Sequence, residues 1–331
     1  MFLSIIIPHY NLPHKLLERC LQSIITLGLP VNEYEVIIVD DGSQTSPAWV
    51  TSLPGNIRLI TADHGGPGNA RNIGIREAKG TYIMFVDADD YLSDNGDIHK
   101  CIEKLKSENP QILRYKYIIE HEGKKKNARS RRRIRFSNTI SGATYMEKYN
   151  LSGSPWLYFF QRELALKKGI EFPIGMFHED EEFNTILHYH ALTLIDSNAT
   201  LYNYCIRNGS TTANSSKEFE KSRIADFIHI VERVHNFAQT NSTKCNPIQA
   251  RAIAHKLDTL TVDAILNMMY TGMSAKEIRR TCKEKFTPIG LYPLRKASYS
   301  LKYRIFRKLA NSKAGMLLLR IALPSRKPAK R

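Results

Sequence analysis

Two aspartates, Asp87 and Asp89, follow directly after an apolar, β-favouring run at residues 82–86. This run predicts a buried strand of an α/β sheet. Ligands of open α/β sheets bind beyond the carboxyl ends of the strands. Two carboxylates at such a point can hold a hard cation, Mg²⁺ or Mn²⁺, which fills its remaining positions with phosphate and water. The alternative is a solvated acidic turn, because Asp is common in turns.

A second group of acids occupies residues 179–182 and precedes apolar residues at helical spacing, Phe183, Ile186 and Leu187. The spacing predicts that the acids lie in the first turn of a helix, where the helix dipole favours negative charge. The sequence has no His-Glu-x-x-His motif, which excludes a zinc protease of that type. These acids therefore cap a helix, act as a base, or do both.

Strands and helices alternate in the N-terminal part of the chain. Strands are predicted at residues 3–7, 34–39, 57–60 and 82–86, with helices at 15–27 and 69–78. This alternation predicts a parallel sheet with crossover helices, an α/β fold. Polar loops follow three of the strands, at residues 10–11, 40–43 and 87–89. Because such loops meet at one edge of a parallel sheet, we expect a nucleotide to bind there.

The composition is that of a globular protein, with 331 residues, 42% apolar and 9% aromatic. Five dispersed cysteines without Cys-x-x-Cys spacing indicate reduced thiols and a cytosolic compartment. The apolar start lacks a basic leader and is interrupted by Pro8, so we expect no signal peptide. No run is long and apolar enough to predict a membrane span.

The net charge of +16 comes from two local features in an otherwise mildly acidic chain. Residues 276–331 hold 17 Lys or Arg against 2 Glu, and residues 124–135 hold 8 basic residues and no acid. This distribution disfavours a general nucleic-acid-binding domain and favours basic patches that meet an anionic surface.

The last segment, residues 291–331, interleaves apolar side chains with twelve basic residues and no acid. This composition predicts an amphipathic helix lying on an anionic membrane leaflet. The alternatives are a basic helix packed on the catalytic domain and an RNA-binding tail. The charged connector at residues 120–135 predicts a solvated hairpin or flexible loop, or a contact with head groups or a polyanionic acceptor.

Four motifs occur in order, SIIIPHYN at 4–11, VDDGS at 39–43, GNARNIG at 68–74 and FVDADD at 85–90. Together they resemble the nucleotide-sugar-binding half of family 2 inverting glycosyltransferases, which have the GT-A fold. The resemblance covers roughly residues 1–210. Each motif is weak alone, but their order and spacing are specific.

The resemblance implies roles for the residues that follow the first two strands. It assigns Tyr10 to stacking on the nucleotide base and Asp41, with Asp40, to hydrogen bonds with the base or ribose. Arg71 would contact the base or orient those acids. The alternatives are a turn cap for Asp40 and an ordinary surface arginine for Arg71. The matched motifs also place three further residues in the nucleotide-sugar site, Pro8, Asn69 and Ala88.

The resemblance also implies the groups that handle the diphosphate. Asp89 would bind Mn²⁺ or Mg²⁺ directly, and Asp87 would reach the ribose or a metal-bound water. Asp90 could share the metal role. The segment at residues 202–212 is similar to the final Tyr-x-x-Arg-x-x-Ser/Thr segment of the family, where a flexible loop closes over the diphosphate. Arg207 and Ser210 are the candidates for that contact.

On the acceptor side, Trp156 could pack against a sugar ring or belong to the core. The family has a Glu-Asp pair whose aspartate is the catalytic base, and Glu179 and Asp180 match it. The resemblance therefore implies Asp180 as the base, with Glu179 and His178 as substitutes.

The sequence predicts a metal-dependent inverting glycosyltransferase of cell-surface polysaccharide synthesis, with a UDP-sugar donor of the hexosyl or N-acetylhexosaminyl type. The expected acceptor is a glycan or lipid-linked hydroxyl, with no nucleic-acid partner. We expect a GT-A domain at residues 1–212, divided near residue 110 into nucleotide-sugar (1–110) and acceptor (111–212) halves. A helical extension at 213–290 and the basic tail at 291–331 follow. The expected location is cytoplasmic, at the inner face of the plasma membrane.

Three other classes remain as alternatives. A nucleotidyltransferase that makes activated sugars would need a Gly-rich, Lys- or Arg-bearing loop after the first strand. A phosphatase would place its Asp-x-Asp motif after that strand. A membrane-bound scaffold without activity would leave the ordered acids unexplained.

Overall fold

The computed structural model describes residues 1–94, 96–121, 124–126, 133–151, 153–207, 217–297 and 299–323. The chain divides into two units, which are described separately. The first contains residues 1–145 and 152–208, and the second contains residues 146–151 and 209–331.

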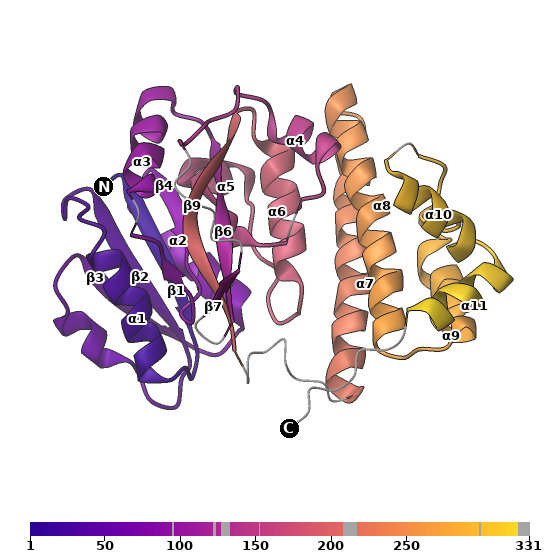
Figure 1. Cartoon of the computed structure of the whole chain (residues 1–331), viewed down its shortest axis with the longest axis horizontal. Coiled ribbons are helices and arrows are strands. Elements are labelled where there is room, and N and C mark those ends of the chain that lie inside the picture. The colour runs from indigo at the N-terminus through magenta and orange to yellow at the C-terminus, as the bar shows by residue number, and fades with distance from the viewer. Residues whose placement is uncertain are drawn as a thin grey trace. The chain divides into compact units, whose positions relative to one another are not determined.

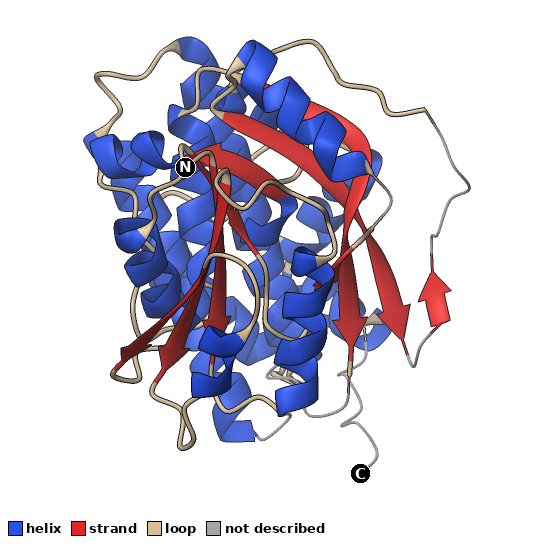
Figure 2. Ribbon diagram, turned by 90° about the vertical axis from the view of Figure 1, so that its left-hand side faces the viewer, coloured by secondary structure: helices blue, strands red, loops and turns tan. Residues whose placement is uncertain are grey.

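The first unit is built on the sheet drawn in Figures 1 and 2. Its strand order is β3-β2-β1-β4-β8-β6-β9-β5. Its first half consists of β1 (Leu3–His9), β2 (Tyr34–Asp41), β3 (Ile57–Ala62) and β4 (Tyr82–Phe85). These four strands pair in parallel, as the alternation of strands and helices predicts. Their carboxyl ends therefore meet at one edge, where the expected acids lie.

The second half of the sheet is mixed. It consists of β5 (Tyr91–Leu92), β6 (Ile112–His121), β7 (Lys124–Lys126), β8 (Tyr158–Gln161) and β9 (Leu194–Ile206). β8 is antiparallel to both of its neighbours, β4 and β6, whereas β6 and β9 are parallel. β7 forms a hairpin with β6, as predicted for the start of the charged connector, and most of the remaining connector lies outside the described residues.

Several helices accompany this sheet: α1 (His14–Ile25), α2 (Pro67–Glu77), α3 (Asp97–Glu108), α4 (Gly142–Lys148), α5 (Arg162–Lys168) and α6 (Glu179–His190), with two 3₁₀ turns, η1 (Ala48–Ser52) and η2 (Pro155–Leu157). Helix α2 packs on β1 and β2. Continuous apolar runs such as residues 5–7 of β1 are fully buried, as expected for strands covered on both faces.

An aromatic cluster fixes the start of α6 against the end of β4. Phe183 of α6 stacks on Phe172 with ring centroids 3.8 Å apart and an interplanar angle of 7°. Both rings meet Phe85, the last residue of β4, edge to face at 6.2 and 5.6 Å. Such offset and edge contacts add to the burial of large apolar area. The acids of the α6 first turn are therefore held close to the Asp87–Asp89 loop.

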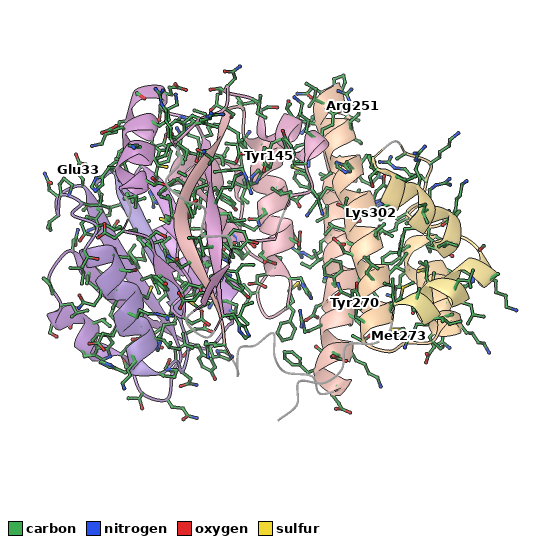
Figure 3. The ribbon with its side chains drawn as sticks, in the orientation of Figure 1. Glu33, Tyr145, Arg251, Tyr270, Met273 and Lys302 are labelled. Atoms are coloured by element: carbon green, nitrogen blue, oxygen red, sulfur yellow. The ribbon has the colours of Figure 1, made fainter. Side chains whose placement is uncertain are left out.

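The second unit consists of helices: α7 (Lys217–Thr240), α8 (Pro247–Tyr270), α9 (Ala275–Thr281), a π-helical turn η4 (Cys282–Phe286), α10 (Leu301–Ala310) and α11 (Lys313–Ala322). Helix α7 packs on α8, and α11 packs on α9 and α10. Asn246 and Gln249 form a capping box at the start of α8. Figure 3 labels Arg251 and Lys302, which belong to α8 and α10.

The basic tail is folded where the structure describes it, as two short helices instead of one. Tyr303 of α10 and Met316 and Leu319 of α11 are buried. Arg295 Nε donates to Asp258 Oδ2 of α8 at 2.5 Å. The inner face of this segment therefore packs within the second unit, through Arg295 on α8 and through α11 on α9. Among the described helices, none is long and apolar enough to cross a bilayer.

Gly80 provides a test of the parallel half of the sheet. A Cβ at Gly80 would lie 2.5 Å from the backbone nitrogen of Ser4 and 2.7 Å from the carbonyl carbon of Leu3. Because these atoms belong to β1, they cannot move without disturbing the strand. We expect Gly80→Ala to lower the free energy of unfolding by about 2–3 kcal/mol, measured by urea denaturation.

Gly153→Ala is the matched control, since its Cβ would meet only the movable end of the Glu181 side chain. We expect it to cost less than half as much as Gly80→Ala. Equal losses for the two variants would contradict the close approach at Gly80.

Candidate functional site

Arg71 joins three separate elements at the carboxyl edge of the sheet. It extends from α2, with Nη2 2.9 Å from Asp87 Oδ1 beyond β4 and Nη1 3.1 Å from Glu179 Oε1 at the start of α6. The residue is only 6% exposed, and its guanidinium lies over the rings of Phe85 and Phe172. A fork of fixed geometry that pairs with two carboxylates sets their separation. Arg71 is thus a central residue of the site and not an ordinary surface arginine.

Asp180 lies next to this junction, in the first turn of α6. Burial raises the pKa of Asp180 well above its ordinary value, and the negative charges of Glu179 and Glu181 raise it further. Burial also raises the pKa of Glu179, although the Arg71 guanidinium opposes that shift. Because Arg71 already occupies Glu179 Oε1, Asp180 is better placed to accept a proton. Raised carboxylate pKa values are typical of general bases.

Asp89 is partly exposed, as is Asp87. The two side chains are 24% and 26% exposed, and Arg207 Nε lies 2.8 Å from Asp89 Oδ2. The backbone carbonyl of Asp89 accepts a hydrogen bond from Arg19 Nη2 at 2.6 Å. The structure therefore brings together Arg207 and Asp89, which the sequence assigned to the same diphosphate region. Ser210, the other residue proposed there, lies outside the described residues.

A divalent cation fits the chemistry of Asp89, although no cluster of three His, Cys, Asp or Glu side chains is found among the described residues. Mg²⁺ typically takes one or two protein carboxylates and completes its shell with substrate phosphate and water. One partly exposed carboxylate beside an arginine suits such a shared shell. Asp87 also has one oxygen paired with an arginine, because Arg71 holds its Oδ1 as Arg207 holds Asp89 Oδ2.

Asp90 connects the loop after β4 to β9. It is 1% exposed, its Oδ2 accepts a hydrogen bond from the Tyr202 hydroxyl at 2.7 Å, and its Oδ1 accepts one from the Cys205 backbone N–H at 2.7 Å. Burial, with the nearby charge of Asp87, raises the pKa of Asp90 to about 8. Both oxygens are therefore used within the fold, and these contacts support a structural role for Asp90 instead of a share in the metal site.

Asp41 holds the loop between β3 and α2. Its two carboxylate oxygens accept hydrogen bonds from the backbone N–H groups of Gly65 and Gly66, each at 2.9 Å, and Oδ2 lies 2.8 Å from His64 Nδ1. Asp41 is only 2% exposed. The contacts that the structure shows for Asp41 thus position the loop between β3 and α2 at the carboxyl edge of the sheet.

Asp40 is fully buried and only partly satisfied. Its Oδ1 lies 3.3 Å from His9 Nδ1 and 3.3 Å from the Ser43 N–H, a contact of the kind expected for a turn cap. Its Oδ2 is buried without a hydrogen-bond partner among the described residues. An unsatisfied buried acceptor is costly, so a donor group of a ligand at this point would be stabilising.

Tyr10 and His64 form an aromatic pair at the same edge. Tyr10 is 45% exposed, and its ring stacks on His64 with centroids 4.2 Å apart and an angle of 21°. An exposed aromatic ring with one supported face can stack on a nucleotide base. The sequence analysis missed His64, and the only available signal was its place in the polar loop before Gly65.

The remaining assigned residues are placed as follows. Trp156 is 7% exposed and stacks on Tyr202 and Tyr204 at 4.3 and 5.6 Å, which fits its alternative as a core aromatic. Pro8 lies in β1 opposite Val39. Ala88 is buried between the two aspartates, and Asn69 lies in the first turn of α2.

The contacts that two residues make at the site could not be predicted from the sequence. Arg19 lies on α1, where it reads as an ordinary polar position, yet it donates to the Asp89 carbonyl and lies over the Tyr91 ring. Tyr202 belongs to a recognised segment, but its hydroxyl also accepts a hydrogen bond from the Asp87 N–H at 3.1 Å, which no periodicity predicts.

Comparisons with known proteins give consistent results. Residues 4–176 match the model of glycosyl transferase family 2. The poly(ribitol-phosphate) beta-glucosyltransferase of Bacillus spizizenii is 42% identical over 98 residues, which are 28% of this chain and 15% of that protein. TarS of Staphylococcus aureus, a poly(ribitol-phosphate) beta-N-acetylglucosaminyltransferase, is 34% identical over 98 residues, 28% of this chain and 17% of TarS. The uncharacterized glycosyltransferase YibD of Escherichia coli is 26% identical over 233 residues, 63% of each chain.

Two solved structures show the same fold. The crystal structure of S. aureus TarS 1–349 with UDP-GlcNAc has a TM-score of 0.55 at 19% identity, covering 87% of this chain and 89% of that one. The mannosyltransferase PcManGT from Pyrobaculum calidifontis, with GDP-Man and Mn²⁺, has a TM-score of 0.55 at 15% identity, covering 96% and 86%. The GT-A fold predicted from the sequence is thereby confirmed.

The aligned segments span 15% of the B. spizizenii enzyme, 17% of TarS and 63% of YibD. The family model, in contrast, covers more than half of this 331-residue chain, including all four sequence motifs and the start of the acceptor half. This chain therefore belongs to glycosyl transferase family 2.

Proposed function

We propose that the chain transfers a sugar from a nucleotide-sugar to a hydroxyl group of a glycan or lipid-linked acceptor, with inversion at the anomeric carbon. The observation that carries this proposal is the junction at Arg71, which contacts Asp87 at 2.9 Å and Glu179 at 3.1 Å. Asp180, the proposed base, directly follows Glu179 in α6, so the junction supports its position at the same edge as the acids after β4. A single displacement needs the base and the leaving group to act on the same bound substrates.

In the proposed reaction, Asp180 removes the proton from the acceptor hydroxyl as that oxygen forms a bond to the anomeric carbon. The bond between the anomeric carbon and the diphosphate oxygen breaks, and the nucleoside diphosphate leaves with the bonding electrons. Arg207 provides positive charge near Asp89, where the diphosphate would lie. Preorganised charge at a developing anion lowers the barrier of such reactions.

Asp89 is the residue proposed to hold a divalent cation, either Mn²⁺ or Mg²⁺. When bound, such a cation neutralises charge on the leaving diphosphate. Asp87 would reach the ribose or a water in the cation's shell, and Tyr10 would stack on the base. The Mn²⁺ in the structure of PcManGT supports a divalent cation in this fold.

A UDP-sugar of the hexosyl or N-acetylhexosaminyl type is the proposed donor. Support comes from TarS, whose structure is in complex with UDP-GlcNAc, and from relatives named as glucosyl- and N-acetylglucosaminyltransferases. Because those two act on poly(ribitol-phosphate), the proposed role is in synthesis of a cell-surface polysaccharide. We also propose that the enzyme acts at the inner face of the plasma membrane through its basic C-terminal segment.

Asp180→Asn tests the base. The amide keeps the shape of the side chain but cannot accept the proton, so we expect kcat to fall by about 10²- to 10⁴-fold while the Kd for the donor stays within about twofold. Turnover is measured with the acceptor present, and donor binding by calorimetry. A parallel loss of donor affinity would point to a nucleotide or structural role, and a larger kcat loss in Glu179→Gln would move the base to Glu179.

Aspartate ordinarily has a pKa of about 4. Because the pKa of Asp180 is raised, we expect the acidic limb of the pH profile of kcat/KM to lie at a higher pH than that. The base must be deprotonated, so activity is lost as pH falls through this raised pKa. Glu179→Gln removes a negative neighbour that raises the pKa, so the limb should move to lower pH. Glu163→Gln, a change at an exposed residue of α5, should leave the limb in place.

Asp89→Ala tests the cation site without disturbing the core, because the side chain lies after β4 and is partly exposed. We expect Mn²⁺-dependent enhancement of UDP binding and of turnover to disappear, with the melting temperature little changed. The control is Asp94→Ala, a change at an exposed aspartate in the next connection, between β5 and α3. Near-normal turnover of Asp89→Ala at low Mn²⁺ would refute the assignment.

A further inference from the structure

The last two helices are apolar on two opposite sides. On α11, Gly315, Met316 and Leu319 are buried, whereas Leu317, Leu318 and Ile321 are 54%, 57% and 71% exposed. On α10, Leu301 and Ile305 are 63% and 52% exposed, although Tyr303 between them is buried. A helix that only packs on a domain needs one apolar stripe. The inner stripe accounts for folding, so the outer one requires another explanation.

The inner side is firmly attached to the helical unit. The Tyr299 hydroxyl donates to Asp258 Oδ2 at 2.6 Å, and the Tyr303 hydroxyl donates to the Arg295 carbonyl at 2.9 Å. On α11, Arg320 Nε donates to the Met273 carbonyl at 2.9 Å. The exposed apolar residues are therefore presented by a folded α10–α11 pair and not by a detachable tail.

The outer apolar residues are concentrated in a small part of the chain. Among the described residues, five of the fifteen exposed large apolar side chains belong to α10 and α11, which have ten residues each. Isolated exposed apolar residues are normal, but a contiguous group usually marks an interaction surface. We name Leu301, Ile305, Leu317, Leu318 and Ile321 the outer apolar group.

Basic side chains accompany the outer apolar group. Lys302, Arg304 and Lys308 of α10 and Lys313 of α11 are exposed, and residues 291–331 contain no acid. Lys302 is labelled on α10 in Figure 3. Within the described part of the chain, no carboxylate lies within ion-pair distance of these four side chains. The surface thus offers uncompensated positive charge next to apolar side chains.

From this combination the geometry points to the surface of an anionic lipid bilayer as the occupant: the outer apolar group enters the region between head groups and acyl chains, and the basic side chains contact the anionic head groups. Helices that lie in the membrane interface have this pairing of apolar and Lys/Arg-rich character. At ten residues each, α10 and α11 are too short to span a bilayer and can only lie on it.

Two other partners fit less well. Protein interfaces are depleted in lysine and enriched in aromatic residues at their centres, whereas the outer apolar group is aliphatic and surrounded by Lys and Arg. Single-stranded nucleic acid needs exposed aromatic rings for base stacking, whereas the two aromatic residues of α10, Tyr303 and Phe306, are buried and half-buried. The basic side chains could bind the phosphates of RNA, but the five exposed aliphatic side chains would gain nothing from that contact.

The test is flotation of the full-length protein with phosphatidylcholine vesicles that contain or lack phosphatidylglycerol. We expect binding only to the anionic vesicles. The triple change Leu317→Glu, Leu318→Glu and Ile321→Glu should reduce the partition coefficient by at least about tenfold. The same three charges introduced by Leu166→Glu, Ile174→Glu and Leu192→Glu, at exposed residues of the first unit, form the matched control.

A second variant keeps the test decisive if the first folds poorly by circular dichroism. Lys302→Gln, Arg304→Gln and Lys308→Gln change only exposed charges, and we expect weaker binding to anionic vesicles at low salt, with a smaller salt dependence. Equal binding to neutral and anionic vesicles, unchanged binding of the Leu317, Leu318 and Ile321 variant, or an equal loss in the matched control would overturn the inference.

This inference names the residues behind the membrane partner of the proposed function but does not require sugar transfer. Turnover with a water-soluble acceptor should be the same in the wild type and the triple variant. A protein that floats with vesicles but transfers no sugar would contradict only the proposed reaction. One that transfers sugar but ignores vesicles would contradict the inference and the membrane location proposed with it, and would leave the proposed reaction intact.

Discussion

The site depends on the buried guanidinium group of Arg71. Arg71 brings Asp87 and Glu179 within 2.9 and 3.1 Å of a single guanidinium, although they come from parts of the chain about ninety residues apart. Without this charge, the buried carboxylates would repel one another, and removing one partner of a buried ion pair typically costs 3–5 kcal/mol. Arg71 therefore holds the start of α6 against the end of β4 by ion pairing. The stacked rings of Phe172 and Phe183 hold the same two elements together by apolar packing.

Other acids at this edge form hydrogen bonds with groups of the protein itself. Asp41 holds the backbone of Gly65 and Gly66, and Asp90 connects its loop to Tyr202 and Cys205. Positioning of this kind is made during folding, so less ordering is required when a substrate binds. Asp89 differs, because its side chain is partly exposed and contacts Arg207.

Much of the first half of the fold could be predicted from the sequence because its signals are local. The runs that form β1, β2 and β4 are apolar and contain β-branched or aromatic residues, and their polar ends locate the site. The antiparallel β8 was not predicted as a strand, because its position between β4 and β6 depends on long-range pairing. The Tyr10–His64 stack and the Arg19 contact also arise from tertiary packing, which periodicity does not report.

The two-sided helix α11 also has a consequence for how copies of the protein behave in solution. Its exposed aliphatic side chains can meet those of another copy, while the acid-free basic segment around them repels that copy. Added salt shortens the range of this repulsion but leaves the apolar attraction largely intact. Colloidal stability should therefore fall as ionic strength rises, so a low-salt buffer, and not the customary high-salt one, should keep concentrated protein dispersed.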